Sequence, residues 1–262
     1  YEGKEQWASL DFEYYTPKEL YDIMRAGNRI LTTQVPTDEF ERVFGKYLEE
    51  GFDLVYIGCS LKQSSSVNTG TVVAKKILES YPDAKIFCID SLNACIGEGM
   101  LAMKAAGLRD EGLDAQTIHE KILAMRNTVN EFVTVHSLDC LKRAGRVKAS
   151  SAFFGNLFGV KPILIADAEG YQSAFKKVKG RQGSLQEVVS LMKENIVNPE
   201  EQCIYIVHAD CAEEAGQLRE MVEKEIPCKS TYTTFIGPII GASVGPDTIG
   251  LYAFGKEVTY RG

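Results

Sequence analysis

Residues 53–74 read DLVYIGCSLKQSSSVNTGTVVA, and the pattern along this stretch changes twice. An apolar run at 54–57 has the length and composition of a buried strand. Six of the eleven residues that follow Cys59 are serine, threonine or asparagine. Apolar residues then recur at helical spacing up to Leu78. The stretch therefore predicts a strand, a hydroxyl-rich turn and a helix, in that order.

This order of elements predicts a binding site for a small anionic group. In open α/β sheets, ligands bind beyond the carboxyl ends of the strands. The N-terminus of the following helix offers unpaired backbone N–H groups and a partial positive charge, and the hydroxyls add further donors. The alternative is that the serines only cap and solvate an ordinary turn.

The composition narrows the class of protein. With 262 residues, 45% hydrophobic and 25% charged, the chain is typical of a globular protein of one or two domains. A net charge of −7 argues against nonspecific binding to nucleic acid or to an anionic membrane. No apolar run reaches the ~18 residues that a membrane-spanning helix needs, and no signal peptide is recognised.

The cysteines and histidines indicate neither a metal site nor disulfides. The seven cysteines include no CxxC pair, and the three histidines have no ligand spacing. We therefore expect reduced thiols in a cytoplasmic protein that holds no metal and no cofactor.

The first half of the chain alternates helices and strands, which predicts a parallel sheet flanked by helices. Helices are expected after caps at Thr16, Thr37 and Asp114 and over 97–107, and strands at 84–90 and 131–135.

The second half contains more hairpins. A short helix broken at Gly145 is expected within 138–148, and a capping box of Ser184 and Glu187 is expected to open another helix. A further helix is expected at 211–225, and strands at 161–166, 171–178, 203–208, 228–232 and 250–254.

We expect an α/β fold of two domains, an N-terminal domain at 1–155 and a smaller C-terminal domain at 156–262. A ligand site between such domains is the default expectation. The apolar and aromatic residues at 151–158 are either core or the wall of an apolar pocket.

Common catalytic and nucleotide-binding motifs are missing from the sequence. It has no Walker loop, no GxGxxG and no HExxH. The bases or nucleophiles on offer are Cys59, Asp90 and histidines distant in sequence. We assign no catalytic residue, because hydroxyls without a neighbouring base favour binding over catalysis.

Six segments, taken in order, identify a resemblance to a known family. They read TTQVP at 32–36, SLKQSSS at 60–66, IDS at 89–91, LKRAGR at 141–146, GVKPIL at 159–164 and IGPIIGASVGP at 236–246. Together they resemble the motifs of the DegV family of bacterial fatty-acid-binding proteins, from about residue 16 to the C-terminus.

The resemblance implies a two-domain α/β carrier that is not itself an enzyme. A long-chain fatty acid such as palmitate or stearate would lie in a buried tunnel, for presentation to a separate fatty acid kinase. Transient contact with a membrane is also implied. The residues that would hold the carboxylate are Thr32, Thr33, Ser60, Leu61 and Ser243.

Some positions depart from the family pattern. Ser243 stands where the family commonly has a histidine, and Ser64, Ser65 and Ser66 replace its Ser-Gly-Thr. The family's opening strand has no counterpart, so we expect one sheet strand to be missing. Lys179 and Arg181 fall where the family has basic segments, which makes them candidates for contact with the partner.

Two other functions stay open from the sequence. The chain could be an enzyme that acts on a small phosphorylated or carbonyl substrate in the interdomain cleft. It could also be a regulatory binding module whose loaded state signals to a partner.

Overall fold

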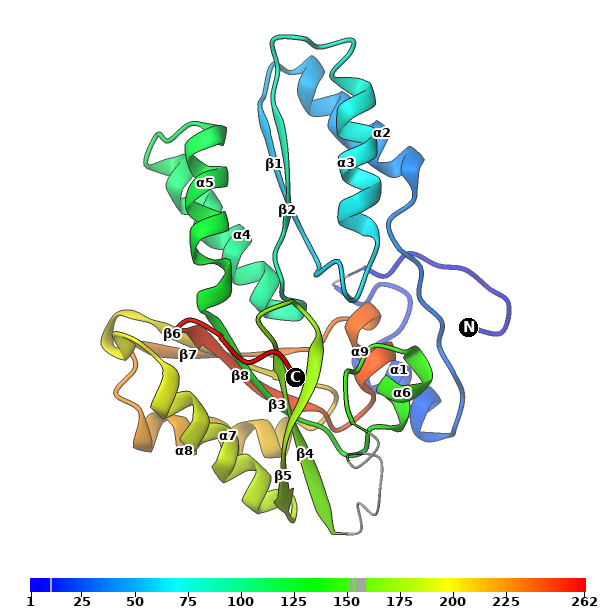
Figure 1. Cartoon of the computed structure of the whole chain (residues 1–262). Coiled ribbons are helices and arrows are strands. Elements are labelled where there is room, and N and C mark those ends of the chain that lie inside the picture. The colour runs from blue at the N-terminus through cyan, green and yellow to red at the C-terminus, as the bar shows by residue number, and fades with distance from the viewer. Residues whose placement is uncertain (10, 151–152, 154–158) are drawn as a thin grey trace. The chain divides into compact units, whose positions relative to one another are not determined.

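The computed structural model describes residues 1–9, 11–150, 153 and 159–262 (Figure 1). The apolar stretch at 151–158, expected to be core or pocket wall, lies outside the described residues apart from Phe153. The chain divides into two compact units. The larger unit comprises Tyr1–Thr32 and Thr128–Gly262, and the smaller unit comprises Thr33–Asn127.

The smaller unit is built on a pair of parallel strands. Its elements are α2 (Thr37–Glu49), β1 (Leu54–Gly58), α3 (Ser66–Ile77), β2 (Ile86–Asp90), α4 (Cys95–Asp110) and α5 (Ala115–Met125), with η1 (Arg126–Thr128) at its end. β1 and β2 pair in register from Leu54 opposite Ile86 to Gly58 opposite Asp90. The predicted strand, turn and helix at 53–78 are therefore confirmed.

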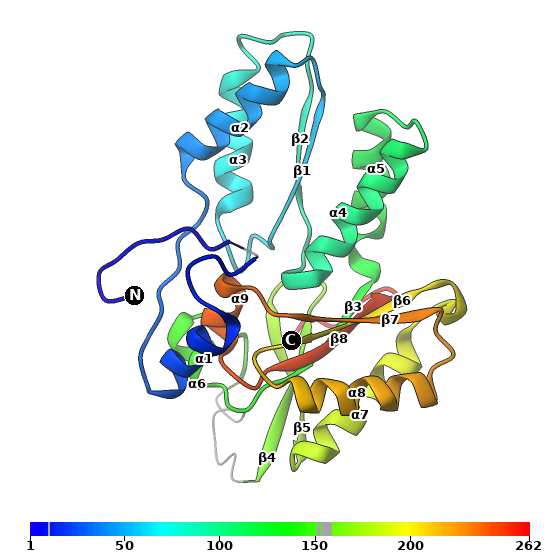
Figure 2. The same cartoon turned by 180° about the vertical axis from the view of Figure 1, so that it is seen from behind.

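Helices cover both faces of this strand pair (Figures 1 and 2). Phe40 of α2 and Val73 of α3 are buried against Tyr56 on one face. On the other face the ring of His119 in α5 stacks on Phe87 of β2, with centroids 4.6 Å apart. Alternate side chains of a strand point to opposite faces, so each apolar run serves two helix layers.

The larger unit is a six-stranded sheet with helices. Its elements are α1 (Pro17–Arg25), β3 (Val129–Thr134), α6 (Asp139–Ala144), β4 (Val160–Ala166), β5 (Gln172–Lys179), α7 (Arg181–Asn195), η3 (Pro199–Glu201), β6 (Cys203–His208), α8 (Ala212–Glu225), β7 (Ser230–Phe235), α9 (Pro238–Val244) and β8 (Ile249–Phe254). The strand order is β5-β4-β3-β8-β6-β7, and only β6 and β7 run parallel.

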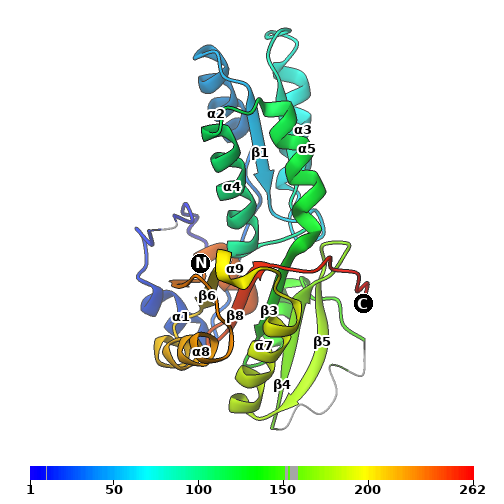
Figure 3. The same cartoon turned by 90° about the vertical axis from the view of Figure 1, so that its left-hand side faces the viewer.

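The core of the larger unit lies between this sheet and helices α7 and α8. Val188 and Met192 of α7 and Leu218 of α8 pack with Ile206 and Leu251 of the sheet, and all five are fully buried. The β4–β5 hairpin extends beyond the other strands, as Figure 3 shows.

The predicted α/β class is confirmed, but one strand has a different place from that expected. Residues 131–135 were predicted to join the parallel sheet of the first half. Instead β3 pairs antiparallel with β8, from Val129 opposite Phe254 to Thr134 opposite Ile249. The predicted boundary between residues 155 and 156 consequently falls inside the larger unit, which contains the whole C-terminal half of the chain.

Two of the predicted N-terminal helix caps are confirmed by hydrogen bonds between the side chain and its own helix. Thr16 and Glu19 form a complete capping box at α1, and Asp114 accepts a hydrogen bond from Thr117 N of α5 at 2.7 Å. The predicted capping box at Ser184 is wrong. α7 begins three residues earlier, after Gly180 with φ +73°, and the Ser184 hydroxyl donates to the Arg181 carbonyl.

A close contact between α1 and α9 fixes these two helices in the larger unit. Tyr21 of α1 is fully buried and its hydroxyl donates to Ile236 O at 2.8 Å. Gly241 of α9 lies directly against the Tyr21 ring, so that a Cβ at this position would overlap the phenol. Because the ring is fully buried and its hydroxyl is bonded, moving it aside would disturb that hydrogen bond.

We expect Gly241→Ala to lower the free energy of unfolding by about 1–3 kcal/mol, because the added methyl overpacks a closed contact. The measurement is urea denaturation. Gly216→Ala in α8 is the control, since nothing lies within 4 Å of its added Cβ. That variant should be stabilised by about 0.5–1 kcal/mol through helix propensity. Equal stability of the two variants would contradict the packing argument.

Candidate functional site

The carboxyl ends of β1 and β2 meet in the smaller unit, because the strands are parallel and Gly58 lies opposite Asp90. Ser60, two residues after β1, is completely buried. Its backbone N–H donates to Asn93 O at 2.8 Å, and its carbonyl accepts from Ser64 N at 2.9 Å. The turn after β1 is therefore folded against the segment after β2.

Asp90 orders this turn. Its Oδ1 accepts hydrogen bonds from Leu61 N at 3.3 Å and from Leu92 N at 2.9 Å. Arg126 donates to the Asp90 carbonyl at 2.7 Å. The Asp90 carboxylate thus bonds both loops at the strand ends. The Leu61 N–H donates to this carboxylate.

The hydroxyl-rich turn and the TTQVP segment come together in the smaller unit. Val35 N donates to Ser66 Oγ at 3.2 Å, and Gln34 Nε2 donates to Thr69 Oγ1 at 3.0 Å. Ser64 N and Ser66 N lie at the start of α3, where Ser64 Oγ accepts from Ser66 N and is 3.0 Å from Ser66 Oγ. Two of the six motifs, far apart in sequence, are thereby neighbours, and Thr33 precedes the bonded Gln34.

A half-buried carboxyl group near these strand ends was not predicted from the sequence. Glu98 lies in the first turn of α4, and burial raises its pKa from 4.5 to about 7. Its charge also helps to raise the pKa of Tyr56, after the larger effect of burial on that phenol. The only signal in the sequence was an acid between Gly97 and Gly99 at the start of a small-residue helix.

Thr32 and Ser243 line one cavity in the larger unit. The cavity has a volume of about 90 Å³. Its walls come from the end of α1 and the segment after it, from α6 and the residues that follow, and from α9. The lining residues are Met24, Asn28, Arg29, Ile30, Leu31, Thr32, Cys140, Arg143, Ala144, Arg146, Ala242 and Ser243.

Arginines make this cavity a place for an anion. Arg29, Arg143 and Arg146 all line it, and no carboxylate is among the described lining residues. Arg29 donates to the Arg143 carbonyl at 3.1 Å, and the Arg143 guanidinium donates to Cys140 Sγ at 3.3 Å. Guanidinium groups form charge-assisted bonds with carboxylate or phosphate. Arg143 and Arg146 belong to the LKRAGR segment, which the sequence had singled out. The sequence did not predict that α1 and α9 supply the other walls of the cavity.

The two basic residues named as candidate partner contacts differ in their surroundings. Lys179, at the end of β5, is exposed. Arg181 has only 18% of its side chain exposed, and it donates to Glu214 Oε2 and to Asp247 O, both at 2.6 Å. Its charge is therefore used within the larger unit, and Lys179 is the better candidate for a contact with a partner.

The described residues contain no group of three or more His, Cys, Asp or Glu side chains that could hold a metal ion. All seven cysteines are free thiols. Across the parts of the chain that the structure describes, none of the helices has the length and apolarity needed to span a membrane.

Comparisons with known proteins place these features in a family. The model of the DegV family, described as uncharacterised proteins, matches residues 9–256. A DegV domain-containing protein of Clostridium perfringens is 35% identical over 240 residues, which cover 92% of this chain and 82% of that protein.

Solved structures have the same fold. A fatty-acid-binding DegV family protein from Thermus thermophilus gives a TM-score of 0.83 at 26% identity, over 94% of this chain and 86% of that one. A stearic-acid-binding protein from Eubacterium ventriosum gives a TM-score of 0.79 at 27% identity, over 95% and 89%.

The half-buried Glu98 predicts a dependence of stability on pH. Its pKa is raised in the folded protein, so between pH 4.5 and about 7 only the unfolded chain loses this proton. The free energy of unfolding should therefore fall as the pH rises through this window, by up to about 3 kcal/mol. Glu98→Gln should reduce this fall in urea denaturation at several pH values, and the part that remains belongs to the buried Glu131, whose pKa burial also raises to about 7.

The control is Glu111→Gln, on an exposed carboxyl at the other end of α4. It should keep the slope of the unchanged protein. If Glu98→Gln and the unchanged protein have the same slope, the burial argument for Glu98 is wrong.

Proposed function

The chain belongs to the DegV family, and we propose on this basis that it binds a long-chain fatty acid, such as palmitate or stearate, by its carboxylate. The proposal is supported by the fatty acids named for the solved relatives from Thermus thermophilus and Eubacterium ventriosum. The observation that carries it within this chain is the arginine-lined cavity shared by Thr32 and Ser243.

In this proposal the hydroxyls of Thr32 and Ser243 donate to the carboxylate, and Arg29 supplies positive charge. The family resemblance also implies Thr33, Ser60 and Leu61 for the carboxylate, and these three residues belong to the smaller unit. Ser243, at the place where the family pattern commonly has a histidine, would then donate with a neutral hydroxyl.

The head group and the tail of the ligand make different contributions to the binding free energy. Each charge-assisted hydrogen bond contributes about 1.5–3 kcal/mol, whereas each buried CH₂ contributes about 0.8 kcal/mol. For a chain of palmitate length the tail therefore dominates the affinity. The polar residues decide which end of the ligand goes where and distinguish an acid from a neutral ester.

We further propose that the loaded protein presents the fatty acid to a separate kinase, with Lys179 as a contact, and that it meets membranes only transiently. In this role it catalyses nothing and needs no cofactor. Its free thiols favour a reducing compartment such as the cytoplasm.

Binding is favoured over the enzymatic alternative by the state of Asp90. Asp90 is one of the bases that an enzyme could use here. Its carboxylate already accepts hydrogen bonds from two backbone N–H groups and orders the loops at the strand ends. A carboxylate with this structural role is a poor general base, because a proton on its Oδ1 would oppose both bonds.

We expect an organic extract of the purified protein to contain a long-chain fatty acid in roughly equimolar amount, because a buried acyl chain dissociates slowly. Mass spectrometry of the extract measures this. A small phosphorylated or carbonyl compound in place of the acid would favour the enzymatic alternative and contradict the proposal.

We expect Ser243→Ala to weaken binding of palmitate about tenfold, by loss of one charge-assisted bond, and to leave binding of methyl palmitate unchanged. Titration with both ligands measures the two affinities. Ser190→Ala is the control, because this serine in α7 bonds only its own helix at Gln186 O. Equal losses for acid and ester would exclude Ser243 from the head-group site.

A further inference from the structure

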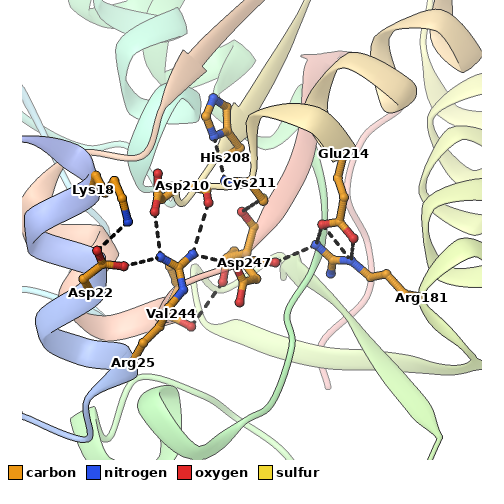
Figure 4. Close-up of polar contacts among 11 residues, drawn as sticks. Lys18, Asp22, Arg25, Arg181, His208, Asp210, Cys211, Glu214, Val244 and Asp247 are labelled. Carbon is orange, nitrogen blue, oxygen red and sulfur yellow. Dashed lines mark hydrogen bonds and ion pairs between the residues drawn. The ribbon is translucent and has the colours of Figure 1, made fainter.

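Arg25, the last residue of α1, joins three parts of the larger unit (Figure 4). Its Nη1 lies 2.6 Å from Asp210 Oδ2 and 3.0 Å from Asp22 Oδ1. Its Nη2 donates to Asp247 Oδ1 at 2.7 Å and to the Asp210 carbonyl at 3.1 Å. Asp22 belongs to the same helix, whereas Asp210 and Asp247 lie in two different loops.

Those two loops are themselves tied together. Ala209 N donates to Thr248 O, and Asp247 N donates to Ala209 O, both at 2.8 Å. Asp210 and Asp247 each have a φ of +59°, a left-handed conformation that is unfavourable for residues other than glycine. The guanidinium thus holds two carboxylates in place, and these come from loops that are far apart in sequence.

Arg25 and Asp247 are close in sequence to residues that line the arginine-lined cavity. Arg25 follows Met24, a lining residue, and the segment after it leads to Thr32. Asp247 comes four residues after Ser243, with Gly245 ending α9 between them. One wall of the cavity therefore ends at Arg25, and another ends at the loop that Arg25 holds.

We propose that Arg25 is a positioning residue, which sets Thr32 and Ser243 at the spacing that a carboxylate requires. This inference rests on the proposed function. A planar guanidinium can bond both loops at once, whereas a lysine ammonium is a single point of charge on a flexible stem. The Arg25 side chain itself is not among the residues that line the cavity.

Other contacts hold the helices together without Arg25. The Tyr21 hydroxyl bonds Ile236 O, and Gly241 packs on the Tyr21 ring, which keeps α1 and α9 in contact. Arg181 bonds the Asp247 carbonyl and so supports the same loop from its other side. We therefore expect an Arg25 variant to fold, with the cavity ends of α1 and α9 less precisely placed.

The test compares palmitate with methyl palmitate as probes of Arg25→Gln. The affinity for palmitate should fall about tenfold, as for the loss of one charge-assisted bond, while the affinity for the ester stays unchanged. The carbon-13 resonance of carboxyl-labelled palmitate should also shift or broaden in the variant. Arg25→Lys should recover only part of the lost preference for the acid.

Asp22→Asn is the matched control, because it removes the partner within α1 and leaves both loop contacts of Arg25 intact. It should keep the wild-type preference for the acid. Asp247→Asn, which weakens the loop contact alone, should reproduce the effect of Arg25→Gln and replaces that variant if it does not fold.

Equal losses of acid and ester binding in Arg25→Gln, or no loss of either, would overturn the positioning role. A wild-type protein that binds neither ligand, or binds the ester as well as the acid, would instead contradict the proposed function. The two failures are therefore distinguishable in one set of titrations.

Discussion

The antiparallel pairing of β3 with β8 is the constraint on which the division of the chain depends. It joins the segment that begins at Val129 to a strand near the C-terminus, by backbone hydrogen bonds along the whole length of both. Residues 33–127 thereby become a separate unit inserted into the larger one. As a result Thr32, where the chain leaves the larger unit, lines the same cavity as Ser243, although more than two hundred positions separate them in sequence.

Arginines of the larger unit differ in their surroundings according to whether they line this cavity. No carboxylate is among the described residues that line it, and Arg29 and Arg143 place positive charge in its wall. Arg25, outside the cavity, is instead surrounded by Asp22, Asp210 and Asp247. Arg25, paired with several carboxylates, fixes loops, whereas Arg29 and Arg143 contribute positive charge to the wall of the cavity.

Carboxyl groups in the smaller unit differ in the same way. Asp90 accepts backbone N–H groups and orders the loops at the strand ends. Glu98, half-buried in the first turn of α4, has its pKa raised to about 7 by partial loss of solvent. A composition count treats both as surface acids of a chain with net charge −7. Their roles follow from hydrogen-bond donors and burial, which only the folded chain supplies.

The sequence by itself determined the features that depend on neighbouring residues. The strand, turn and helix at 53–78 and the caps at Thr16 and Asp114 follow from side chains that bond or pack within a few positions. The six ordered motifs also identified the family. Tertiary structure alone decided the partner of β3, the start of α7 after Gly180 and the gathering of Arg29 and Arg143 beside Thr32 and Ser243. These depend on contacts between residues distant in sequence, and local periodicity carries no information about such contacts.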